Sequence, residues 1–73
     1  MSWESALAKA IEMKAVCVIE YVKADGTKTS RSIEPQEVKG DTLFAIDQNG
    51  RQIKQFKLAR IEGFSMTAER FGG

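Results

Sequence analysis

Apolar residues near the start of the chain recur at the spacing of a helix. They fall at positions i, i+4, i+7 and i+8, and the residues between them are mostly polar or charged. Such a stripe is typical of a helix that buries one face. Ser2 belongs to the residue types that cap helix N-termini, so the pattern predicts a helix over about residues 3–13. The stripe consists of Trp3, Leu7, Ala10 and Ile11.

After this helix the pattern changes to short β-branched and aromatic runs separated by turn signals. Residues 15–22 begin with apolar side chains on both faces, which favours a strand covered on two sides. The pairs Asp25-Gly26 and Asn49-Gly50 tolerate the positive φ of tight turns. Further turns are expected at Gly40-Asp41 and Ala59-Arg60. The remaining strands are expected over residues 27–33 with a continuation over 36–39, then over 42–47, 51–58 and 61–66.

Two places in these strands are expected to be irregular. Pro35 has no backbone N–H, so it should end its strand, bend it or lie on a sheet edge. Ile53 falls on one parity of its strand, whereas Phe56 and Leu58 fall on the other. This change of parity predicts a bulge or a twist near Gln55.

One helix followed by about five short strands leaves few residues to cover both faces of an open sheet. Closing the strands into a small barrel removes the exposed edges. The predicted fold is therefore mainly β with one N-terminal helix, built as a small Sm-like or SH3-like five-stranded barrel. We expect a single domain over residues 1–73, with the barrel over about 15–67 and a loose tail over 68–73.

Composition narrows the possible functions of this domain. The chain has 11 basic and 10 acidic residues and a net charge of +1, so binding to nucleic acid would need a local basic patch. It has one cysteine and no histidine, which excludes His/Cys metal sites and histidine-based catalysis within one chain. We therefore expect a cytoplasmic, non-enzymatic protein with no cofactor, no metal and no membrane span. Cys17 alternates with Ile19 in an apolar strand and is expected to be a small core residue.

Several motifs run in the order and spacing of a known family. They are Leu7, Ala10-Ile11, Cys17-x-Ile19-x-Tyr21, Asp25-Gly26, Arg31-x-Ile33-Glu34-Pro35, Leu43-x-Ala45-x-Asp47, Phe56-x-Leu58-x-Arg60-Ile61 and Phe71. With these residues the chain resembles the WYL domain over nearly its whole length. The triplet Trp-Tyr-Leu that names the family is Asp41-Thr42-Leu43 here, so only its leucine is present.

The resemblance implies a fold and a role. WYL domains are Sm-like barrels preceded by a helix, and they usually follow a winged helix-turn-helix in bacterial transcription regulators. They act there as sensor or oligomerisation modules, and several bind single-stranded nucleic acid or nucleotide-like ligands through a basic groove. For this chain the resemblance implies a stand-alone form of the domain, lacking the usual helix-turn-helix, with a binding role and no catalysis.

A basic segment carries the candidate chemistry. Residues 48–61 contain four cations and no acid. These cations could neutralise phosphates, and an aromatic ring from Tyr21, Phe44 or Phe56 could stack on bases. The resemblance implies that Tyr21, Arg31 and Arg60 match the family's motif positions and that Lys57 stands where an arginine is usual. The predicted ligand-binding residues are Tyr21, Arg31, Lys57 and Arg60, with Arg51 and Lys54 as possible additional basic contacts.

Other interpretations of these residues stay open at this point. The basic segment could be a solvated strand face whose edge lysines oppose aggregation. Arg31 could pair with Glu20 or Glu34 instead of binding a ligand. The domain could also be a protein-interaction or oligomerisation module, with a contact patch built from Trp3, Met13 or Phe64. Because so small a core stabilises a chain only weakly, self-association or a protein partner is expected.

Overall fold

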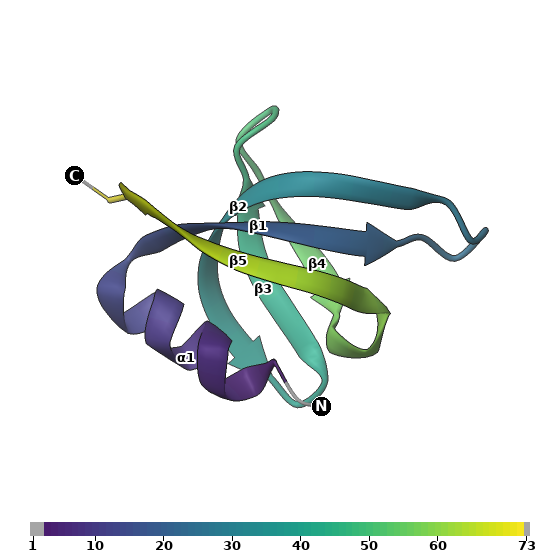
Figure 1. Cartoon of the computed structure of the whole chain (residues 1–73), viewed down its shortest axis with the longest axis horizontal. Coiled ribbons are helices and arrows are strands. Elements are labelled where there is room, and N and C mark those ends of the chain that lie inside the picture. Colours follow the sequence, from purple (N-terminus) through teal and green to yellow (C-terminus); the bar gives the residue numbers. More distant parts are fainter. Residues whose placement is uncertain (1–2, 73) are drawn as a thin grey trace.

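The computed structural model describes residues 3–72 and confirms a mainly β fold with an N-terminal helix (Figure 1). Ser2, the expected helix cap, lies outside the described residues. The elements, in chain order, are α1 (Glu4–Met13), β1 (Ala15–Val22), β2 (Lys28–Lys39), β3 (Thr42–Asp47), β4 (Gln52–Lys57), the 3-10 turn η1 (Leu58–Arg60) and β5 (Ile61–Arg70). No helix in the described part of the chain is long and apolar enough to cross a bilayer.

Helix α1 forms where the apolar stripe predicts it and buries that stripe. Leu7 and Ala10 are completely buried, and Trp3 packs against the core. Trp3 occupies the N-cap position without a side-chain capping bond, and its indole Nε1 donates to the carbonyl of Ile61 at 2.9 Å. The helix ends at Met13, and the C-cap residue Lys14 adopts a left-handed conformation with φ 55°. Trp3 therefore fastens the start of the helix to the start of β5.

All five strands form one antiparallel sheet in the order β4-β3-β2-β1-β5. The turn glycines Gly26 and Gly50 both have positive φ, as the turn signals predict. Strand β2 joins the two halves of the sheet, because its first half pairs with β1 and its second half pairs with β3. The change of partner occurs at Ile33, and a register shift follows between Pro35 and Glu37. Pro35 therefore lies at an irregularity within β2 and does not end the strand.

The sheet curls until strands that are not neighbours in it come into contact. The ring of Tyr21 from β1 meets the ring of Phe56 from β4 edge to face, with centroids 5.1 Å apart. The backbone N–H of Lys57 donates to the Tyr21 hydroxyl at 3.1 Å. Within residues 3–72, β4 and β5 remain the two edges of the sheet and are joined by η1. The core inside the curl consists of Leu7, Ala10, Ala15, Cys17, Ile19, Ile33, Leu43, Ala45, Phe56 and Ile61.

Two details of the expected strands need correction. The predicted bulge near Gln55 is wrong, because β4 pairs with β3 in unbroken register. Ile53 interrupts the alternation of apolar residues along β4 because its side chain points away from the core and is 65% exposed. Strand β5 also continues to Arg70, into the segment expected to be a loose tail, and the N–H of Phe71 donates to the Lys14 carbonyl at 2.8 Å.

Cys17 is fully buried, and its thiol donates to the Ala15 carbonyl at 3.5 Å. Burial raises the pKa of this thiol to about 11. Because the thiolate is the reactive species, we expect Ellman's reagent at about pH 8 to modify the folded protein at least ~100-fold more slowly than the urea-unfolded chain. Equal rates in the two states would show that Cys17 is accessible in the folded protein.

Candidate functional site

Antiparallel pairing places Tyr21 and Arg31 on the same face of the sheet. Residues directly opposite each other in such a pair point to the same side. Tyr21 in β1 is opposite Thr29 in β2. Arg31 in β2 is opposite Ile19 in β1, which is completely buried. Tyr21 and Arg31 are thus diagonal neighbours on the concave, core-facing side.

Strands β3 and β4 add three more residues to this concave side. Asp47 is opposite Ile33, the residue two positions after Arg31. Lys54 is opposite the buried Ala45, and Phe56 is opposite the buried Leu43. We refer to the group at the open end of the curl as the mouth cluster, which consists of Tyr21, Arg31, Asp47, Lys54 and Phe56.

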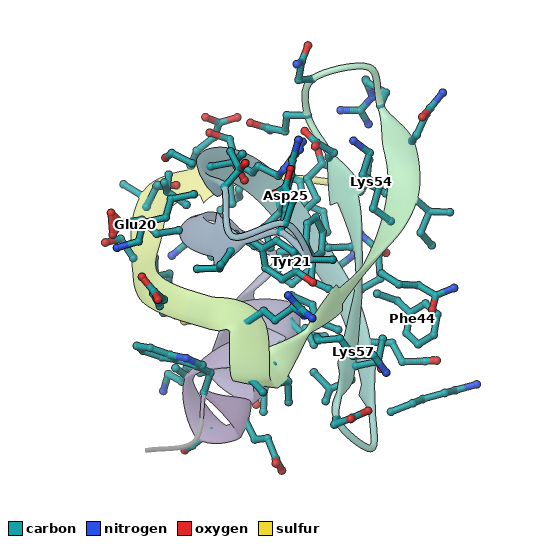
Figure 2. All side chains as sticks on the ribbon, turned by 90° about the vertical axis from the view of Figure 1, so that its right-hand side faces the viewer. Glu20, Tyr21, Asp25, Phe44, Lys54 and Lys57 are labelled. Carbon is teal, nitrogen blue, oxygen red and sulfur yellow. The ribbon has the colours of Figure 1, made fainter. Side chains whose placement is uncertain are left out.

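Figure 2 views the molecule from this open end. Tyr21 lies near the centre of this view and Lys54 lies against the β3–β4 hairpin that carries it, whereas Phe44 lies on the outer side of that hairpin. Helix α1 lies on the other side of the molecule (Figure 1). Phe44, a stacking candidate in the sequence, is therefore separated from the mouth cluster, while Tyr21 and Phe56 belong to it.

Asp47 is the centre of the mouth cluster. Its Oδ2 lies 2.7 Å from Nη1 of Arg31 and 3.3 Å from Nζ of Lys54. Its Oδ1 accepts the backbone N–H of Asn49 at 2.9 Å. Burial alone would raise the pKa of Asp47, but the Asn49 amide, Arg31 and Lys54 outweigh it and hold that pKa below its ordinary value. The carboxylate is therefore charged at neutral pH and bound to two cations.

Two of the other predicted cations, Arg51 and Lys57, are paired with acids on neighbouring segments. Arg51 Nη1 lies 2.9 Å from Oε2 of Glu34, a residue only 5% exposed. Lys57 Nζ lies 3.7 Å from Oδ1 of the exposed Asp41. Although residues 48–61 contain no acid, strand pairing brings acids from elsewhere against them. The four cations of the segment therefore do not act as one unneutralised patch.

Arg60 is exposed in η1 and has no side-chain hydrogen bond or ion pair with any residue from 3 to 72. The structure thus brings Tyr21, Arg31 and Lys54 together. It joins Lys57 to Tyr21 through the backbone only, and it shows no bond between Arg60 and the mouth cluster.

The partner of Arg31 differs from both acids that the sequence offered as possible partners. Glu20 neighbours Ile19 in β1 and therefore points to the opposite face from Arg31. Glu34 stands three residues after Arg31 in the same strand, so it also points to the opposite face. Of the two alternatives open for Arg31, the pairing with Glu20 or Glu34 is therefore wrong in its partner, because Arg31 pairs with Asp47. The signal that would have found Asp47 is its register with Ile33, which is fixed by pairing and not by local sequence.

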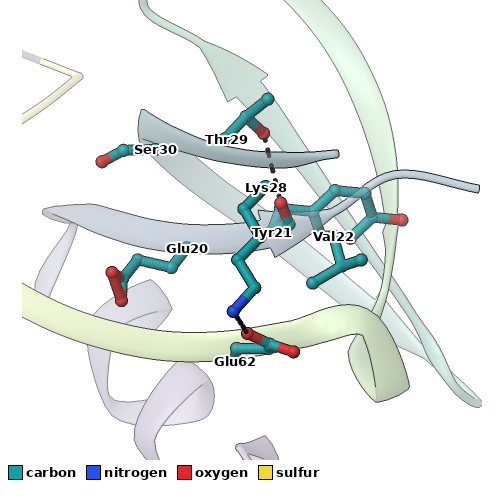
Figure 3. A pocket seen from close by; sticks show the side chains of 7 residues that line it. All are labelled: Glu20, Tyr21, Val22, Lys28, Thr29, Ser30 and Glu62. Carbon is teal, nitrogen blue, oxygen red and sulfur yellow. Dashed lines mark hydrogen bonds and ion pairs between the residues drawn. The ribbon is translucent and has the colours of Figure 1, made fainter. Parts of the chain in front are cut away.

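Two hollows border this region. One, of about 390 Å³, is lined by Ser30, Arg31, Ser32, Asp47, Gln48 and Asn49, and it gives access to the central ion pair. The other, of about 260 Å³, lies beside the β1–β2 hairpin and contains Glu20, Glu62 and Lys28, with Lys28 Nζ 3.4 Å from Glu62 Oε1 (Figure 3). Since its acids outnumber its single cation, the second hollow is poorly suited to an anion. The first hollow is the better candidate for an anionic group.

The described residues thus form a small, mainly β domain that carries a pair of cations on one buried carboxylate beside the Tyr21 ring. The model of the WYL domain family matches residues 4–66, so the chain belongs to the WYL domain family. No curated protein matches its sequence.

A solved structure is also similar to this chain. It is the structure of Proteasome accessory factor B/C (PafBC) of Arthrobacter aurescens, with a TM-score of 0.85 and 19% sequence identity. The alignment covers 96% of this chain and 12% of the PafBC chain. At this identity the likeness establishes the fold alone. The WYL fold in this chain therefore corresponds to one small part of a longer protein in PafBC.

Proposed function

We propose that this WYL domain is a non-catalytic regulatory module that binds single-stranded nucleic acid or a nucleotide-like ligand at the mouth cluster. The observation that carries the proposal is the convergence of Arg31 and Lys54 on one oxygen of Asp47, at 2.7 and 3.3 Å. Two cations and one anion leave this cluster with a formal charge of +1 beside the aromatic pair of Tyr21 and Phe56. Cations and stacking rings are the two components of sequence-tolerant single-strand binding.

Each predicted residue has a distinct role in this proposal. Arg31 and Lys54 contact a phosphate, and the ring of Tyr21 stacks against a base. Lys57, at the end of β4, and Arg60, in η1, contact phosphates farther along the nucleic-acid strand. Arg51 provides a further phosphate contact. Lys57 and Arg51 would first have to exchange a carboxylate for a phosphate, whereas Arg60 has no such partner in residues 3–72. The regulatory role rests on membership of the WYL family.

Salt dependence tests this proposal. We expect a labelled mixed-sequence oligonucleotide to bind saturably at about 50 mM salt, with affinity falling as salt rises. Arg31→Met should lower the slope of log affinity against log salt by about 0.7, the value for one phosphate contact on a single strand. Fluorescence anisotropy across a salt series measures both quantities.

Lys9→Met is the matched control, because it removes one positive charge from an exposed position on α1. It should leave the salt slope unchanged. The proposal fails if the unaltered protein shows no saturable binding. It also fails if Lys9→Met lowers the slope as much as Arg31→Met does, since binding would then follow overall charge.

Protein interaction or oligomerisation is the alternative function. Edge strands β4 and β5 favour it, because unpaired edges can add a strand from another chain. Trp3 and Phe64 do not support this alternative, because both pack against the core and their ring centroids lie 6.0 Å apart. Met13, the third residue of the apolar contact patch considered with Trp3 and Phe64, is 37% exposed and therefore accessible to a partner. Self-association stays a prediction.

A further inference from the structure

Asp47 lies deeper in the protein than the two cations that it binds. Its side chain is 2% exposed, while those of its partners Arg31 and Lys54 are 23% and 37% exposed. The carboxylate therefore lies beneath the two cations and holds both from the protein side. Arg31 and Asp47 line a hollow that solvent can enter, and Lys54 is bonded to the same oxygen of Asp47 as Arg31 is.

The two cations keep most of their hydrogen-bonding capacity. A guanidinium carries five N–H donors and an ammonium carries three. In residues 3–72, Arg31 has one side-chain hydrogen bond and Lys54 has one, and both bonds go to Asp47. Further donors on each side chain are thus available to an anionic group that approaches the pair from solvent.

Two long cationic side chains lose considerable conformational freedom when they are fixed. A ligand that had to order these two side chains itself would bind more weakly, because the entropy cost of ordering them would reduce its binding free energy. Asp47 fixes both in the folded protein, and Asp47 is itself fixed by the N–H of Asn49. The geometry of the cation pair is therefore set before a ligand arrives.

We infer that Asp47 is a positioning residue, which holds Arg31 and Lys54 at the spacing that receives one phosphodiester group of the ligand. This inference rests on the proposed function and names the residue that organises its phosphate contact. Asp47 itself does not touch the phosphate. Its negative charge lowers the attraction of the site for an anion, and its positioning effect outweighs that loss.

Asp47→Asn separates positioning from charge, because the two accounts predict opposite results. If Asp47 positions the cations, the variant binds the oligonucleotide about tenfold more weakly. Loss of a residue that only orients a ligand-binding side chain has an effect of about this size in metal sites. If Asp47 acts only through its charge, the variant binds more tightly and its salt dependence becomes steeper. Anisotropy titrations at about 50 mM salt measure the affinities, and circular dichroism confirms that the variant is folded.

Asp41→Asn is the matched control, since it removes one negative charge from an exposed ion pair with Lys57. We expect it to leave affinity unchanged or to raise it slightly. If Asp47→Asn does not fold, Arg31→Lys replaces it. That variant keeps the charge beside Asp47 but loses the forked donors, so positioning predicts a loss of about tenfold and charge alone predicts none.

The outcomes separate this inference from the proposed function. If the unaltered protein binds and Asp47→Asn binds as tightly or more tightly, the inference is wrong and the proposed function stands. Wild-type affinity in Arg31→Lys would likewise overturn the inference. If the unaltered protein does not bind the oligonucleotide, the proposed function and the inference fail together.

Discussion

Leu7→Ala is expected to unfold most of the protein at physiological temperature. Leu7 is completely buried and anchors α1 in the concave side of the sheet. Replacing a buried leucine by alanine costs about 2–5 kcal/mol, while a core of this size supplies only ~3–5 kcal/mol in total. Urea unfolding followed by circular dichroism measures the loss directly.

Ile53→Ala provides the matched control for Leu7→Ala. Ile53 is a large aliphatic residue that is 65% exposed on edge strand β4. Its replacement should change the free energy of unfolding by no more than about 0.5 kcal/mol. A loss of less than ~1 kcal/mol for Leu7→Ala would mean that α1 is not an essential part of the core.

The fold was largely predictable because its signals are local. The apolar stripe of α1 and the turns at Gly26 and Gly50 depend on residues a few positions apart, and the structure places them where the sequence does. The predicted bulge near Gln55 failed because an apolar residue was assumed to be buried. Ile53 shows that this assumption is unsafe, since much of a protein's surface is apolar.

The end of β5 was not predictable for a different reason. Its last four residues are Thr, Ala, Glu and Arg, and they contain no run of β-branched or aromatic residues that would indicate a strand. They extend because β1 offers a partner, with Ala15 opposite Arg70. Pairing between segments so far apart in sequence depends on the tertiary structure, which a local pattern cannot reveal.

The same distinction applies to the candidate site. Lys54 was visible in the sequence as part of a segment without acids, and Arg31 as part of a motif of the resembled family. Their partners were not, because Asp47 and Glu34 reach Arg31 and Arg51 only through the register of β2 with β3 and through the β3–β4 turn. Which cations face the concave side also depends on strand parity, and this places Lys54 with Arg31 in the mouth cluster. In the proposed site, Lys54 therefore becomes a central contact and not a possible additional one.

Asp47→Asn is also expected to cost about 2 kcal/mol of stability at neutral pH, because it weakens charged hydrogen bonds from two cations to a buried group. This loss should depend on pH. The pKa of Asp47 is lowered in the folded protein, so its contribution is fully present above the unfolded-state value of about 3.9. The contribution is lost as pH falls through the folded-state pKa, where the carboxyl takes up a proton.

The difference in unfolding free energy between the unaltered protein and Asp47→Asn should therefore be largest near neutral pH and should shrink below about pH 4. Urea titrations at a series of pH values measure this difference. Asp41→Asn alters an exposed ion pair and should differ from the unaltered protein by at most ~0.5 kcal/mol throughout. If the difference for Asp47→Asn stays constant into acid, the loss comes from altered packing, and the carboxylate does not hold Arg31 and Lys54 by its charge.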